Sequence, residues 1–346
     1  MSTKRKGIYT RRQFVSRGLT GAGLCAAVLS RGTSPAQASE APRKANPFAY
    51  PSIPEPKIDP QLLNYEQVAQ FKCPRPEAKR LACGPSGTIY VAAGKYVTIL
   101  DQEGRVGSEI ALGAPARCLA VAPDGTTYIS LRDHVEVFDA QGQRRAVWET
   151  PADRTWFTGL ALGANDLYAA DAGNRVVIQY DRSGKVVRRL GEKDPARRVP
   201  GLVAPSPFLD VELGADGLLR VSNPGRHQIE SYTPGGDLEL VWGRPSSAVD
   251  GFCGCCNPIN LGLLPDGGVV TCEKGIPRVK VYTAQGRLES VVAGPQLFPE
   301  SAKVTAADHA EHIWGGLDVA ADAQGRIYIL DWATGALRVM ARKASA

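Results

Sequence analysis

A short β-turn motif recurs along the chain, and its spacing limits the possible fold more than any other feature. The six copies are Pro85-Ser86-Gly87, Pro123-Asp124-Gly125, Ala164-Asn165-Asp166, Ala215-Asp216-Gly217, Pro265-Asp266-Gly267 and Ala323-Gln324-Gly325. A second turn follows 17 to 19 residues after each of the first five copies, and short runs rich in Val, Ile and Tyr lie between the turns. Turns and runs in this order predict a four-stranded antiparallel meander in each unit.

A single sheet of this kind leaves apolar faces uncovered, but sheets that pack radially around one axis cover each other. The sequence therefore predicts an all-β fold, a six-bladed β-propeller over residues 65–343. The sixth unit, 315–342, ends after its third strand, 336–341. We expect residues 65–71, which precede the first unit, to supply the missing outer strand and close the ring.

Two segments that follow a second strand resemble a known repeat. They are Asp171-Ala172-Gly173-Asn174-Arg175-Val176-Val177 and, more loosely, Asp331-Trp332-Ala333-Thr334-Gly335-Ala336-Leu337-Arg338-Val339. Both are similar to the NHL repeat, whose propellers commonly have six blades. The resemblance implies the fold, and it implies that Asp171 and Asp331 fix their loops by accepting backbone N–H bonds. NHL propellers serve as enzymes, ligand binders and interaction platforms, so the resemblance leaves the function open.

The formal charge of +6 comes from one end of the chain. Residues 1–38 hold seven of the 41 basic residues and no acidic residue, which leaves 34 basic against 35 acidic residues in the rest of the chain. This near-neutral body excludes charge-driven, non-specific binding to nucleic acids and to anionic membranes.

Residues 1–38 have the layout of an export signal: a basic start, a weakly apolar middle and Ala36-Gln37-Ala38 before the expected cleavage point. Arg11 and Arg12, with Phe14 after them, resemble a twin-arginine signal, the alternative being a chance Arg-Arg pair in a general secretory signal. The resemblance implies transport of the folded protein to the periplasm or out of the cell. The mature chain contains no other stretch long and apolar enough to predict a membrane span.

Residues 39–64 contain prolines at short intervals and are expected to form an extended N-terminal arm. Long connections are expected at one end of the propeller, because in a meander the first-to-second and third-to-fourth turns occupy the other end. These connections are 191–207, 243–258 and 294–314. We call the end that they share the long-loop face. All four histidines, His134, His227, His309 and His312, are also expected there.

Loops held on a rigid ring often carry binding residues, so the long-loop face is the expected contact surface for a periplasmic protein or a small-molecule ligand. The first candidate site lies at the connection into the fifth unit. It comprises Cys253, Cys255, Cys256, Cys272, Glu273, His309 and His312. Its cysteines admit three interpretations: structural disulfides, a strained redox-active bond between adjacent cysteines, or a site for Cu or Zn.

The second candidate site lies in the central tunnel. Counting seven residues back from the turn in each unit selects Arg80, Cys118, Gly159, Asp210, Asn260 and Asp318 as equivalent positions on the innermost strands. Asp210, Asn260 and Asp318 offer oxygen ligands for Ca²⁺. In this respect they resemble gluconolactonase-type propellers, in which a tunnel cation activates a lactone or ester. The alternative is a hydrated tunnel in which Arg80 balances the two carboxylates.

These patterns favour an exported binding or partner protein, redox- or metal-linked through its Cys-Gly-Cys-Cys loop. One alternative is a metal-dependent lactonase-like or lyase-like enzyme with Ca or Zn, its ion lying in the tunnel. A second alternative is a structural scaffold with disulfide-bonded cysteines. The chain has no Gly-x-Ser-x-Gly, phosphate-loop or His-Glu-x-x-His motif, so its sequence does not show whether it catalyses a reaction.

Overall fold

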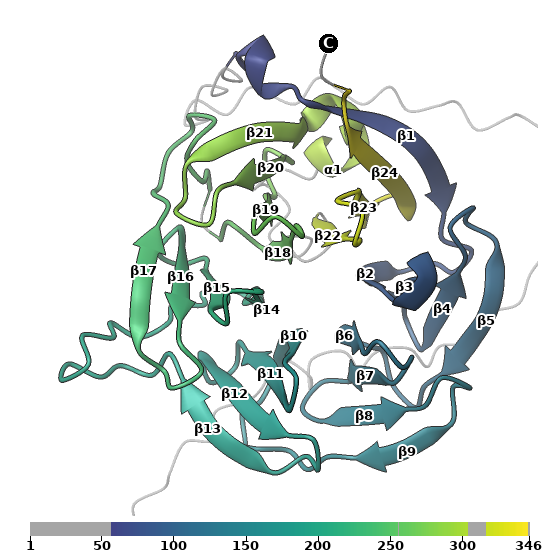
Figure 1. Cartoon of the computed structure of the whole chain (residues 1–346), viewed down its shortest axis with the longest axis vertical. Helices are drawn as coiled ribbons and strands as arrows, with labels where there is room; N and C mark the ends of the chain where they lie inside the picture. The colour runs from purple at the N-terminus through teal and green to yellow at the C-terminus, as the bar shows by residue number, and fades with distance from the viewer. Residues whose placement is uncertain (1–56, 255, 304–315, 345–346) are drawn as a thin grey trace, which may run out of the picture. The chain divides into compact units, whose positions relative to one another are not determined.

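The chain folds into six four-stranded antiparallel sheets, or blades, arranged in a ring (Figure 1). The computed structural model describes residues 57–254, 256–303 and 316–344, and all of them belong to one structural unit. Each blade runs from an inner strand beside the central axis to an outer strand at the periphery, so the predicted six-bladed β-propeller is confirmed.

The first three blades follow one another along the chain, each from its inner to its outer strand. Blade 1 contains β2 (Ala78–Cys83), β3 (Ile89–Ala93), β4 (Tyr96–Leu100) and β5 (Val106–Ala111). Blade 2 contains β6 (Cys118–Val121), β7 (Thr127–Ser130), β8 (Val135–Phe138) and β9 (Arg144–Val147). Blade 3 contains β10 (Phe157–Leu162), β11 (Asp166–Asp171), β12 (Val176–Asp181) and β13 (Val186–Leu190).

The remaining blades complete the ring. Blade 4 contains β14 (Val211–Leu213), β15 (Leu219–Asn223), β16 (Gln228–Tyr232) and β17 (Leu238–Trp242). Blade 5 contains β18 (Asn260–Leu263), β19 (Val269–Cys272), β20 (Val279–Tyr282) and β21 (Leu288–Ala293). Blade 6 contains β22 (Leu317–Ala321), β23 (Ile327–Asp331), β24 (Ala336–Arg342) and, at its outer edge, β1 (Tyr65–Lys72).

Helices are few and short among the described residues. They are the 3₁₀ helices η2 (Pro60–Leu62), η3 (Pro85–Gly87) and η4 (Pro295–Leu297) and the helix α1 (Pro299–Lys303). None of the helices in the described part of the chain is long and apolar enough to cross a membrane.

The ring closes through the strand that the sequence predicted. β1 pairs antiparallel with β24, in a register that runs from Tyr65 opposite Arg342 to Lys72 opposite Ala336. The first and last strands of the propeller therefore share one sheet, which removes two open sheet edges.

The hydrophobic core is divided among the blade interfaces. The buried apolar residues of the described chain form six clusters, one between each pair of neighbouring blades. The second strands are the most buried, and β3 is buried along its whole length. The outer strand β13, in contrast, is exposed at all but its last residue. Each blade thus depends on both neighbours for its core, which explains why the predicted repeat requires a closed ring.

The closing strand gives a first test of stability. Tyr65 is buried between blades 5 and 6, and its hydroxyl accepts a hydrogen bond from Arg342 Nε at 3.1 Å. We expect Tyr65→Ala to lower the free energy of unfolding by about 3 kcal/mol, because it removes a large buried side chain. Val68 on the same strand is 53% exposed, so Val68→Ala is expected to change stability by less than about 0.5 kcal/mol. Denaturant unfolding of both variants measures the difference, and equal losses would show that β1 does not close the core.

Candidate functional site

The six predicted tunnel positions do lie together on the innermost strands. β2, β6, β10, β14, β18 and β22 contact one another in ring order around the axis (Figure 1). Arg80 of blade 1 extends into this centre and is almost fully buried. Its Nη1 lies 3.1 Å from Asp318 Oδ1 and also donates to Asn260 Oδ1. The guanidinium therefore forms an ion pair with Asp318 in the tunnel.

Arg80 also connects blades that are not neighbours. Its Nη2 donates to the carbonyl of Thr158 in blade 3, and its Nε donates to the carbonyl of Arg117, just before β6, at 3.1 Å. Together with the contacts to Asn260 and Asp318, one side chain bonds to four other blades. A planar guanidinium with five N–H donors suits this role better than any other side chain.

Other polar residues of the centre link four pairs of neighbouring blades. Two side chains donate to backbone carbonyls: Thr158 Oγ1 to Leu209, and Asn260 Nδ2 to Leu317 at 2.6 Å. Two carboxylates accept from backbone N–H groups: Asp210 from Leu261 at 2.9 Å, and Asp318 from Leu81 at 2.7 Å. These bonds run from blade 3 to 4, 4 to 5, 5 to 6 and 6 to 1. The three predicted Ca²⁺ ligands thus bond to neighbouring strands, Asp210 and Asp318 through carboxylate oxygens and Asn260 through its side-chain amide.

Burial dominates the electrostatics of the tunnel. It raises the pKa of Asp210 to about 7, although the nearby Arg80 charge acts in the opposite direction. Burial also raises the pKa of Asp318, again opposed by Arg80. Close packing leaves no space for side chains at Gly159, where an added Cβ would lie 2.1 Å from Asp210 Oδ1. The centre is therefore a packed, hydrogen-bonded hub around Arg80.

On the long-loop face, one polar residue at the end of the second strand holds the connection that enters the same blade. The four donor–acceptor pairs are Trp156 N–H with Asp171 at 2.9 Å, Val203 N–H with Asn223 at 3.0 Å, Cys253 N–H with Glu273 at 3.2 Å and Ser301 Oγ with Asp331 at 2.7 Å. Asp171 also accepts from Asn174 N–H at 3.1 Å, and Asp331 accepts from Ala333 N–H at 3.0 Å, which agrees with the loop-fixing role that the NHL resemblance implied for these two residues.

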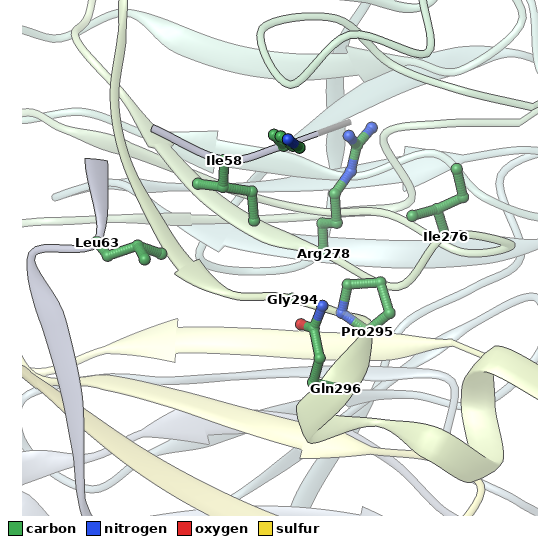
Figure 2. A pocket seen from close by; sticks show the side chains of 8 residues that line it. Ile58, Leu63, Ile276, Arg278, Gly294, Pro295 and Gln296 are labelled. Atoms are coloured by element: carbon green, nitrogen blue, oxygen red, sulfur yellow. The ribbon is translucent and has the colours of Figure 1, made fainter. Parts of the chain in front are cut away.

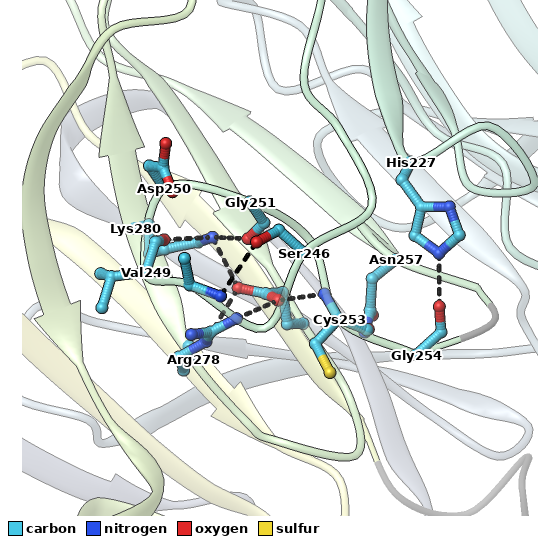
Figure 3. Close-up of polar contacts among 12 residues, drawn as sticks. His227, Ser246, Val249, Asp250, Gly251, Cys253, Gly254, Asn257, Arg278 and Lys280 are labelled. Carbon is cyan, nitrogen blue, oxygen red and sulfur yellow. Dashed lines mark hydrogen bonds and ion pairs between the residues drawn. The ribbon is translucent and has the colours of Figure 1, made fainter. Parts of the chain in front are cut away.

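Blade 5 differs from blades 3, 4 and 6 because its anchor is the longer Glu273, which is fully buried. Arg278 and Lys280 surround its carboxylate, and Figure 3 shows these two cations beside the connection into blade 5. Arg278 donates to the Glu273 carboxylate through Nε at 3.1 Å and Nη2 at 2.7 Å, and Lys280 Nζ lies 2.7 Å from it. Lys280 Nζ also donates to the carbonyls of Val249 at 3.0 Å and Gly251 at 2.7 Å. Burial lowers the pKa of Lys280 to about 8, with Glu273 acting against this shift.

This cluster holds the segment that we call the cysteine loop, residues 253–257. Besides the Cys253 N–H bond to Glu273, Asn257 Nδ2 donates to the Cys253 carbonyl, and Asn257 also exchanges two 2.9 Å hydrogen bonds with the backbone of Lys274. His227, from the β15–β16 loop of blade 4, contacts the Gly254 carbonyl through Nε2 (Figure 3). His227 was expected on this face, and it lies against the cysteine loop.

The cysteines of this site differ in exposure. Cys253 is half-buried, whereas Cys256 and Cys272 are buried in the same apolar cluster between blades 5 and 6. Cys272 pairs with Asn260 across β18 and β19. Burial raises the pKa of the Cys272 thiol well above its ordinary value. Among the described cysteines of this site, Cys253 is therefore the most accessible to solvent.

Several predicted residues lie outside the described part of the chain. They are Arg11, Arg12, Cys255, His309 and His312, together with the export signal and residues 39–56 of the arm. In the described ranges, no group of three or more His, Cys, Asp or Glu side chains is arranged to hold a metal ion. The interpretations that depend on Cys255, His309 and His312 stay predictions.

Arg278 and Lys280 were not identified from the sequence. Arg278 and Lys280 alternate with Val279 and Val281, which is also the pattern of a half-exposed strand. In a propeller the third strand is covered on both faces, and β20 is buried along its whole length. Arg278 directly precedes β20 and Lys280 lies on it, so their place at the third strand of a blade was the clue that the sequence offered.

Comparisons with known proteins support the fold. No family model matches the sequence, and no curated protein matches it. Among solved structures, the chain is similar to a streptogramin B lyase, with a TM-score of 0.56 and 13% identity over 82% of this chain and 100% of that one. It is also similar to selenomethionine-substituted virginiamycin B lyase from Staphylococcus aureus, with a TM-score of 0.55 and 12% identity over 81% of this chain and 100% of that one.

A third similar structure is a catalytically inactive virginiamycin B lyase from Staphylococcus aureus with quinupristin, with a TM-score of 0.56 and 11% identity over 81% of this chain and all of that one. At these identities the similarity establishes the propeller fold and does not transfer an activity.

The raised pKa of Asp210 predicts a specific pH dependence of stability. Its folded-state pKa of about 7 lies above the usual 3.8, so the unfolded chain loses this proton first as the pH rises. The free energy of unfolding should therefore fall between about pH 4 and pH 7 through this group. Asn at position 210 cannot ionise but keeps an oxygen acceptor for Leu261 N–H. The free energy of unfolding of Asp210→Asn should therefore fall less between about pH 4 and pH 7 than that of the wild type. Denaturant unfolding across that range tests this, and parallel profiles for the two proteins would contradict it.

Proposed function

We propose that this chain is a binding protein that acts through its long-loop face, with the cysteine loop as a redox-active element. The observation that carries the proposal is the anchoring of Cys253: its backbone is held on both sides, by Glu273 and by Asn257, while its side chain is only half-buried. Reactive groups work best when a rigid surrounding shell positions them.

The burial of Glu273, Arg278 and Lys280 supports this proposal. Moving three charged side chains out of water is costly, and a buried ion cluster of this kind contributes little net stability compared with apolar packing. In blades 3, 4 and 6 the anchor residue is a shorter Asp or Asn. Blade 5 uses a larger charged cluster, and the segment it fixes is the one that carries the cysteines.

In the proposed reaction, the Cys253 thiolate attacks a disulfide of a partner protein and forms a mixed disulfide. A second cysteine of the loop then attacks the Cys253 sulfur and releases the partner as a dithiol. The loop loses two electrons and two protons and becomes a disulfide, and the partner disulfide gains them. The partner is a protein of an oxidising compartment, which agrees with our further proposal that the chain is exported to the periplasm by the twin-arginine route.

The test is a thiol count on the full-length exported protein, before and after reduction. Oxidised protein should show about two fewer reactive thiols than reduced protein under denaturing conditions. Cys253→Ser should remove this difference. Cys83→Ser is the matched control, because Cys83 is also half-buried but lies on β2 in blade 1, and it should leave the difference intact. An unchanged thiol count on oxidation, or a Cys253→Ser protein that behaves like wild type, would contradict the proposal.

Elemental analysis of the same samples distinguishes a metal site in the cysteine loop from a redox-active thiol. Stoichiometric Cu or Zn that is lost in Cys253→Ser and kept in Cys83→Ser would make the loop a metal site. A protein with no bound metal and no thiol that changes on oxidation would point to a structural scaffold.

The second candidate is a lyase-like or lactonase-like enzyme with an ion in the tunnel. Two observations favour it: Asp210, Asn260 and Asp318 lie together at the centre, and the similar solved structures include lyases. The hydrogen bonds that these three residues make to neighbouring strands and to Arg80 weigh against it. Calorimetric titration with Ca²⁺ tests this second candidate. A tunnel ion requires that the wild type binds Ca²⁺ and that Asp318→Asn abolishes the binding.

A further inference from the structure

A pocket beside blade 5 is not part of the cysteine loop or the tunnel. Its volume is about 440 Å³, within the range of small-molecule sites. Figure 2 shows how the segment before β1, the β19–β20 loop and the start of the connection after β21 contribute to it. The lining residues are Lys57, Ile58, Leu63, Ile276, Arg278, Gly294, Pro295 and Gln296.

Arg278 links this pocket to the buried charge cluster. Its Nε and Nη2 bind Glu273, but its Nη1 is buried and has no hydrogen-bond partner among the described residues. Arg278 itself is only 2% exposed. A buried guanidinium nitrogen without an acceptor is unfavourable, and in native structures such a group points to an absent ligand, ion or water.

The charge balance of the cluster is also incomplete. Glu273 supplies one negative charge against the two positive charges of Arg278 and Lys280. Asp250 also lies near Lys280, but its carboxylate pairs with Arg244 at 2.8 Å. Among the described residues that line the pocket none is acidic, and the side chain of Lys57 adds a further cation to its wall. The charge cluster alone is one anion short of neutrality, and Lys57 raises the excess of cluster and pocket together to two positive charges.

We propose that this pocket binds a small monocarboxylate with an apolar chain. The carboxylate accepts a charge-assisted hydrogen bond from Arg278 Nη1 and neutralises the excess positive charge of the cluster. The chain of the ligand lies against Ile58, Leu63 and Ile276. Leu63 is 40% exposed, and a bound apolar chain would cover it. This ligand site is separate from the proposed thiol chemistry, and its test does not depend on it.

The test is calorimetric titration of the full-length protein with hexanoate and with hexan-1-ol, which share their apolar chain and differ in charge. We expect hexanoate to bind one site with a Kd below about 1 mM. Hexan-1-ol should bind at least about tenfold more weakly, because it cannot form the charge-assisted bond. Equal affinities for the two probes, or no hexanoate binding at millimolar concentration, would overturn the proposal.

Variants locate the site. Ile276→Asp places a negative charge in the lining and should weaken hexanoate binding by at least about tenfold. Val187→Asp is the matched control, because Val187 lies on the outer strand β13 and is 51% exposed, and it should bind like wild type. Arg278→Lys keeps the charge but removes the Nη1 donor, and should also weaken binding. Ile276→Asp keeps the proposal falsifiable if the buried Arg278 variant does not fold, since wild-type affinity in Ile276→Asp would place the ligand elsewhere.

Discussion

The buried guanidinium of Arg80 is the interaction on which the propeller most depends. Each blade is a small sheet whose apolar faces are covered by its neighbours, and apolar contact alone does not fix the blades at one angle around the axis. Directional hydrogen bonds at the centre do fix it, because Arg80 bonds to four other blades and Asp318 bonds back to Leu81 of blade 1. The polar centre therefore fixes the positions of the blades around the axis, whereas the apolar interfaces bury the hydrophobic surface of the blades.

This division is consistent with our proposal that the functional groups lie on the rim. Asp210 and Asp318 are committed to backbone N–H groups at the centre, and Asp318 also pairs with Arg80, whereas the described parts of the long connections are held by polar anchors at the ends of the second strands, such as Asn223 and Glu273. Blades 4 and 5 show how the rim varies on a common plan. Asn223 pairs with Glu230 in blade 4, and at the equivalent positions Glu273 pairs with Lys280 in blade 5. The Glu273–Lys280 pair is neutral in itself, and Arg278, which binds the same carboxylate, is the excess cation of blade 5.

The fold was predictable because its determinants are local. Turn residues at regular intervals define the strands, and counting back from each turn finds the inner ring, including Arg80 and Asp318. The charge cluster was not predictable in the same way, because Arg278 and Lys280 alternate with valines as in a half-exposed strand. The pocket joins the segment before β1 to two loops of blade 5, so no local pattern indicates it.

The most direct test of this account is a double-mutant cycle on Arg80 and Asp318, followed by denaturant unfolding. Arg80→Met alone leaves buried carboxylates without their cation and should cost about 3 kcal/mol or more. Combined with Asp318→Asn, the loss should be smaller than the sum of the single losses, with a coupling free energy of about 2 kcal/mol. Additivity within about 0.5 kcal/mol would show that the two residues act independently, and would contradict the central role of the Arg80 guanidinium.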